Sequence, residues 1–183
     1  FTGSANAYSA VLLELQKHHT QVFCLDPPSH GYSDALKAPD WEKLLKTTKE
    51  LVCGLIENVA DQGEKMILCG DSVGGWMATK IARDMPENLK GLIVFSPFGA
   101  NDDTTQAATQ TAYFDAPNAA CRKYLNDGAL TGSERLGPYV APIISMIIIS
   151  MRQKPSIRPL LRSSKGFDHI RLEDITKLPP YLY

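Results

Sequence analysis

The pattern of apolar and polar positions predicts a chain of alternating helices and strands. Apolar residues recur at helical spacing over 7–19 and again over 41–59, where Asp40 is placed to cap the second helix. Short apolar runs typical of buried strands lie at 21–25, 66–69 and 91–95. A helical stretch ending at Met85 separates the last two runs. Strand, helix and strand in close succession predict a parallel sheet with helices packed on it.

The pattern changes after residue 100. Residues 101–110 are polar, and the stretch to about residue 165 has helical periodicity that several prolines interrupt. Its longest apolar run, 140–151, contains Pro142 and is too short to span a membrane. The tail 175–183 reads as the entry to one more strand, so we expect a helical segment inserted between strands.

Composition narrows the class of protein. Hydrophobic residues make up 44%, charged residues 21%, and the net charge is −1, a balance typical of globular proteins and not of nucleic-acid binders. No signal peptide is recognisable, which favours a cytoplasmic location. The four cysteines form no CxxC pair and are expected to be free and buried, and sparse His and Cys residues without ligand spacing indicate neither a metal nor a cofactor.

The candidate chemistry lies in Gly70-Asp71-Ser72-Val73-Gly74-Gly75, between a predicted strand and a predicted helix. This sequence matches the G-x-S-x-G nucleophile elbow, in which small residues on both sides of the serine allow a sharp turn that exposes its hydroxyl. The helix that follows directs backbone N–H groups toward the same place, so the N–H of Val73 is a candidate oxyanion donor. A structural glycine turn is the alternative.

The resemblance to a known family extends beyond this motif. Residues 26–33, DPPSHGYS, are similar to the D-x-P-G-H-G-x-S loop of α/β-hydrolases, 91–99 resembles their sixth strand, and 178–183 the start of the seventh. The resemblance implies an α/β-hydrolase parallel sheet with a helical cap, incomplete at both ends. The implied domains are a partial core over 1–99, a cap over 100–172, and a return to the core over 173–183.

The resemblance also implies roles for single residues. Phe1 would follow the family's His-Gly motif and supply the second oxyanion N–H, with Thr2 as the alternative. A serine at position 72 implies acyl chemistry, because relatives with Asp there cleave epoxides or carbon–halogen bonds. His30 would order its loop. Apolar residues of the cap would either line an acyl or aromatic pocket or belong to the core; these are Ile143, Ile144, Met146, Ile147, Ile148 and Met151.

A serine hydroxyl needs a histidine and a carboxylate, which in this fold follow it in the order Ser, acid, His. His169 follows Ser72 but precedes the seventh strand, so a surface or packing role is the better interpretation. Some relatives carry the acid at the position that Ser96 occupies here. Asp102 and Asp103 are second choices, and the acid and histidine are expected beyond Tyr183.

The resulting hypothesis is a serine hydrolase that cleaves a carboxylic ester or related acyl bond of a small hydrophobic substrate through a Ser72 acyl-enzyme. Thioesterases, acyltransferases and carbon–carbon bond hydrolases use the same elbow. A start without Met and an end within a predicted strand suggest an internal piece, expected to be inactive and unstable by itself. The other class considered is a non-catalytic binding or regulatory protein on a hydrolase scaffold.

Overall fold

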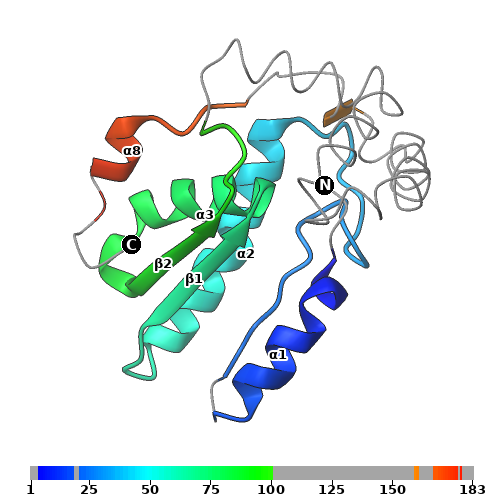
Figure 1. Ribbon diagram of the computed structural model, residues 1–183. Coiled ribbons are helices and arrows are strands. Elements are labelled where there is room, and N and C mark those ends of the chain that lie inside the picture. Colours follow the sequence, from blue (N-terminus) through cyan, green and yellow to red (C-terminus); the bar gives the residue numbers. More distant parts are fainter. Residues whose placement is uncertain (1–3, 19–20, 101–158, 161–166, 177, 179–183) are drawn as a thin grey trace, which may run out of the picture. The chain divides into compact units, whose positions relative to one another are not determined.

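The computed structural model describes residues 4–18, 21–100, 159–160, 167–176 and 178 (Figure 1). These residues belong to two compact units. The first unit contains the described residues of Asp40–Gln106 and Lys165–Tyr183, and the second contains those of Thr2–Pro39 and Ala107–Ser164.

A parallel pair of strands forms the centre of the first unit. Strand β1 (Met66–Asp71) pairs with β2 (Leu89–Phe95), and in the register Asp71 lies opposite Phe95. Helix α3 (Val73–Asp84) and the short 3-10 helix η2 (Pro86–Asn88) connect them. The predicted strand–helix–strand unit is therefore confirmed, and each strand is two residues longer than its apolar run.

Helices α2 (Trp41–Ala60) and α3 cover one face of this sheet (Figure 1). The predicted cap of α2 is present, because the Asp40 carboxylate accepts a hydrogen bond from the Lys43 N–H at 2.7 Å. Side chains alternate along β1, so Met66 and Leu68 pack toward the helices while Ile67 and Cys69 are exposed. The buried core between sheet and helices consists of Ile56, Ala78, Ala82, Leu89 and Leu92.

A segment from the end of the chain packs against α3. Phe167 begins the described part of this segment, which ends in the short helix α8 (Leu172–Thr176) and Leu178. Residues 175 and 176, expected to lead into a strand, form the last turn of α8 instead. Four rings with centroids 4.9 to 5.7 Å apart join the segment to α2, α3 and the turn after β2: Trp41, Trp76, Phe98 and Phe167.

In the second unit, helix α1 (Ser9–Gln16) follows the 3-10 helix η1 (Ala5–Tyr8), and residues 159 and 160 are also helical. The helix predicted over 7–19 is therefore present but shorter. The strand predicted at 21–25 is absent from the described structure, and Val22, Phe23 and Leu25 are exposed there. A strand needs a neighbour to satisfy its backbone groups, and no described segment pairs with this run.

The loop after this run is organised by Asp26. Its carboxylate accepts hydrogen bonds from the backbone N–H groups of Ala5 at 2.7 Å and Tyr32 at 3.1 Å. A Cβ on Gly31, where φ is +50°, would lie 2.1 Å from the same carboxylate. His30 is buried, and its Nδ1 lies 3.0 Å from the Pro28 carbonyl oxygen within the loop. These contacts support the loop-ordering role that the resemblance implied for His30.

Some predictions fall outside the described residues, and the expected burial of the cysteines is wrong in part. The division into core, cap and return segment stays a prediction, because 101–158 and 161–166 are not described; the apolar residues at 143–151 lie there too. Cys24, Cys53 and Cys69 are free as expected, but Cys24 and Cys69 are exposed. The prediction of burial fails because it assumed that apolar runs are covered on both sides, whereas Cys69 lies on the open face of β1. Cys121 is outside the described residues.

Candidate active site

Ser72 lies at the turn between the end of β1 and the start of α3. Its backbone has φ 52° and ψ −115°, a combination that side-chain-bearing residues rarely adopt. Such a conformation costs on the order of 1–3 kcal/mol and persists only where the surrounding structure imposes it. The strand–turn–helix context and the strained serine are the geometry that a nucleophile elbow requires.

Backbone hydrogen bonds hold this turn against the neighbouring strand. The Ser72 N–H donates to the Phe95 carbonyl oxygen at 2.9 Å, at the last residue of β2. The Ser72 carbonyl oxygen accepts from the N–H groups of Trp76 at 3.1 Å and Phe98 at 2.9 Å. Both polar backbone groups of Ser72 are therefore used to fix its conformation.

Two glycines make the turn sterically possible. A Cβ on Gly70 would lie 2.3 Å from the Gly74 carbonyl oxygen, and one on Gly75 would lie 3.1 Å from the Cα of Pro97. A Cβ on Gly74 would meet nothing within 4 Å. The expectation that small residues are needed on both sides of the serine therefore holds at Gly70, while the close approach on the far side is at Gly75 and not at Gly74.

The start of α3 supplies a candidate oxyanion donor. Val73 is the first residue of the helix, so its N–H has no acceptor within the helix, and the partial positive charge of the helix terminus lies at the same place. The Val73 side chain is buried, which holds this backbone group in position. Phe1 and Thr2, the candidates for the second donor, lie outside the described residues.

The residues considered as partners of Ser72 are placed as follows. His169 packs edge-on against the Phe167 ring at 4.9 Å, and its carbonyl oxygen accepts a hydrogen bond from Lys80 at 2.7 Å. These contacts belong to the packing of the terminal segment on α3, in keeping with the packing role expected for it. Ser96 directly follows β2 and is exposed, whereas 102 and 103 are outside the described residues.

Sequence reasoning missed a buried ionic cluster on α3. Lys80 donates at 2.7 Å to Asp168, to the His169 carbonyl oxygen and to Asp174; the side chains of Lys80 and Asp174 are each only 3% exposed. Arg83 also donates to Asp174 at 2.7 Å. The Lys80–Asp174 partners are 94 residues apart in sequence, so no local pattern could have revealed the pair.

The Asp174 carboxylate stays ionised over a wide pH range. Burial by itself raises the pKa of this carboxyl, but hydrogen bonds from the Arg171 N–H, Lys80 and Arg83, together with the charge of Lys80, outweigh burial and lower the pKa to about 2. The cluster therefore pairs a carboxylate that is ionised at neutral pH with two cations on α3.

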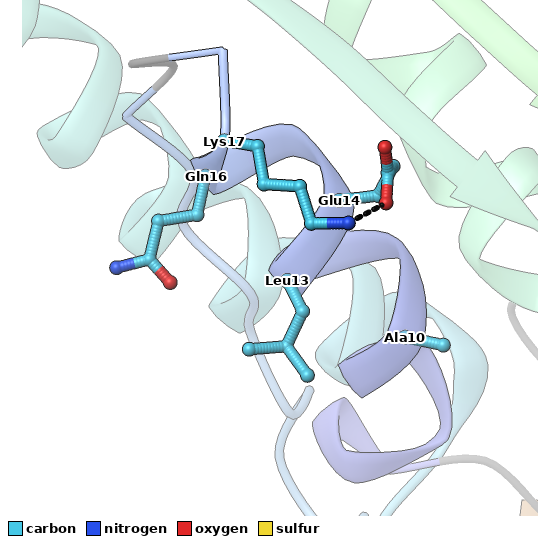
Figure 2. Close-up of a pocket in the computed structure, with 5 residues that line it drawn as sticks. All are labelled: Ala10, Leu13, Glu14, Gln16 and Lys17. Carbon is cyan, nitrogen blue, oxygen red and sulfur yellow. Dashed lines mark hydrogen bonds and ion pairs between the residues drawn. The ribbon is translucent and has the colours of Figure 1, made fainter.

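A shallow hollow of about 630 Å³ lies along α1, lined by Ala10, Leu13, Glu14, Gln16 and Lys17 (Figure 2). Its two charged side chains pair with each other at 2.6 Å. In the described part of the chain, no three His, Cys, Asp or Glu side chains gather as metal ligands, and no helix has the length and apolar character to cross a membrane.

Comparison with known proteins identifies the family of the chain. A search of curated proteins finds no match. The family model described as serine aminopeptidase, S33, an α/β-hydrolase family, matches residues 1–127, a span that contains the Asp26 loop, β1, the Ser72 elbow, α3 and β2. The sequence resemblance, the parallel strand–helix–strand unit and this match agree, and the chain belongs to the S33 serine aminopeptidase family of α/β-hydrolases.

Proposed function

We propose that the intact protein hydrolyses a carboxylic ester or related acyl bond with Ser72 as the nucleophile. The observation that carries this proposal is the strained backbone of Ser72 at a strand-to-helix turn. Strain of this kind has no use in a simple connection, since a glycine would adopt φ 52° without cost. At an elbow it lifts the hydroxyl clear of the sheet, where a substrate can reach it.

The reaction proceeds in two acyl transfers. A histidine takes the Ser72 proton as Oγ attacks the substrate carbonyl carbon, and the Val73 N–H stabilises the negative oxygen of the tetrahedral intermediate. Collapse of the intermediate breaks the bond to the leaving alcohol, which departs with the proton from the histidine. Water then attacks the acyl-enzyme in the same way, releasing the carboxylic acid and restoring Ser72.

The remaining parts of the machinery are assigned by the family's chain order. The second oxyanion N–H comes from Phe1, or from Thr2 if the turn there is shifted by one residue. The acid and the histidine follow the next strand, so His169 is not the general base. Its contacts with Phe167 and Lys80 support that exclusion, since they engage it in the packing of the terminal segment.

The substrate is a small hydrophobic acyl compound. Serine aminopeptidase, the description of the matching family, adds cleavage of an amide at a peptide N-terminus as a second candidate, with the same acyl-enzyme and an amine in place of the alcohol. Thioesters, acyl transfer to another alcohol, and carbon–carbon bond cleavage would use the same elbow. A panel of esters, thioesters and aminoacyl amides with matched acyl groups separates these activities.

The test uses the full-length gene product and a fluorophosphonate probe, which reacts covalently with activated serines. We expect labelling of the wild-type protein and hydrolysis of short acyl esters, both abolished in Ser72→Ala. The matched control is Ser9→Ala, which removes an exposed hydroxyl from α1 and should label as wild type does. A wild-type protein that folds but neither labels nor hydrolyses any member of the panel would favour the non-catalytic binding role instead.

A further inference from the structure

A second serine lies beside the nucleophile at the end of the neighbouring strand. Because Asp71 pairs with Phe95, Ser72 and Ser96 are the next residues after β1 and β2 respectively. Neighbouring strands are about 4.8 Å apart, and the hydrogen bond from the Ser72 N–H to the Phe95 carbonyl oxygen keeps the two chains in register up to this point. In open α/β sheets, ligands bind outside the carboxyl ends of the strands, and both serines are placed there.

Ser96, like Ser72, has a positive φ. Its φ is +40°, and it precedes Pro97, a position at which residues normally prefer extended backbone with negative φ. The close packing of Gly75 on Pro97 accounts for the turn, since a Cβ added at Gly75 would lie 3.1 Å from the Pro97 Cα. A glycine at position 96 would adopt the positive φ with less steric strain. The backbone conformation by itself therefore does not explain why a serine stands there.

The Ser96 hydroxyl is also available to a ligand. The residue is exposed, and its side chain makes no hydrogen bond to any residue that the structure describes. A hydroxyl can both donate and accept, which suits it to a neutral polar group such as another hydroxyl. Ser96 stands at the end of the strand next to Ser72. A substrate hydroxyl near the scissile carbonyl would therefore lie within reach of Ser96.

We propose that Ser96 is a specificity-determining residue, whose hydroxyl hydrogen-bonds a hydroxyl group in the leaving alcohol of the ester. This role rests on the proposed function of Ser72 and narrows its substrate class from simple alkyl esters to esters whose alcohol carries a further hydroxyl group. The strained turn holds the Ser96 side chain at the strand end while the elbow holds Ser72 next to it.

The test compares two esters of the same short acid in the full-length gene product, the 2-hydroxyethyl ester and the propyl ester. We expect the ratio of kcat/KM for the hydroxyethyl ester to that for the propyl ester to fall about 3- to 10-fold in Ser96→Ala, the effect of one neutral hydrogen bond. Ser96→Gly, which removes the same hydroxyl but relieves the backbone, should lower the ratio equally. Ser96→Thr should restore it in part.

The outcomes separate this role from the proposed function. An unchanged ratio in both Ser96→Ala and Ser96→Gly, with hydrolysis that still depends on Ser72, overturns the role of Ser96 alone. A lower ratio in Ser96→Ala but not in Ser96→Gly also overturns it, because the effect then comes from the backbone. If Ser72→Ala still hydrolyses both esters, the assignment of Ser72 as nucleophile is wrong, and the role of Ser96 that depends on it falls too.

Discussion

The backbone of Ser72 is strained because three neighbours leave it no alternative. Phe95, Phe98 and Trp76 occupy both of its backbone hydrogen-bonding groups. Gly70 must pass close to Gly74 for the helix to start immediately after the turn. The residues around Ser72 therefore fix its conformation through their shape and their backbone groups.

This geometry predicts different effects of substitution at the two motif glycines that flank Ser72, Gly70 and Gly74. Gly70→Ala places a methyl group 2.3 Å from the Gly74 carbonyl oxygen, so the turn must move, and we expect a stability loss of roughly 2 kcal/mol or more and loss of fluorophosphonate labelling. Gly74→Ala, the matched control, meets nothing within 4 Å and adds a better helix former, so stability should be unchanged or up to about 1 kcal/mol higher. Urea unfolding of both variants measures the difference. Equal losses in the two would contradict the steric explanation.

At the scale of elements, α3 connects the Ser72 turn to the segment that begins at Phe167. Its first residue follows Ser72, and further along the helix Trp76, Lys80 and Arg83 all bind the terminal segment. The Trp76 indole N–H donates to the Asp168 carbonyl oxygen at 2.6 Å, and the Ile170 N–H donates to the Gly99 carbonyl oxygen at 3.0 Å. The segment is therefore held both to the helix and to the turn after β2.

The buried pair at the centre of this contact should be essential for stability. Lys80→Met keeps the length of the side chain but leaves Asp174 buried with one cation fewer, and removing one partner of a buried pair costs about 3 kcal/mol or more. The control is Lys49→Met, because the Lys49–Asp84 pair is partly exposed at 37% and 33% and should contribute less than about 1 kcal/mol. Urea unfolding curves of both variants provide the comparison. Similar losses would show that Arg83 compensates for Lys80.

At the scale of the whole molecule, the ionic cluster links stability to pH. The pKa of Asp174 is about 2 in the folded chain and 3.8 in the unfolded reference, so the unfolded state takes up the proton first as the pH falls. The contribution of Asp174, about 2 kcal/mol, is fully present above about pH 4 and is lost as the pH approaches 2. Unfolding free energies measured between pH 2 and pH 6 should decline more steeply for wild type than for Asp174→Asn. Parallel pH profiles would contradict this assignment.

The sequence by itself determined the local elements and the position of the Ser72 turn between a strand and a helix. Each local feature depends on residues within one or two turns of each other, so its pattern is readable along the chain. These features are the apolar periodicity at 41–59, the Asp40 cap, the two apolar runs around α3 and the Gly70–Gly75 motif. These features were sufficient to predict a parallel α/β unit with a serine at its strand-to-helix turn. The resemblance that they carried was confirmed by the family match.

Only the tertiary structure decided which residues meet. Three contacts join segments that share no local sequence pattern. They are the Lys80–Asp174 pair, the ring cluster around Trp76 and the close approach of Gly75 to Pro97. The run at 21–25 shows the converse, because a β-rich sequence becomes a strand only when a neighbour satisfies its backbone groups. Helices and turns are encoded within a few residues, whereas pairing and burial depend on what the rest of the chain brings alongside.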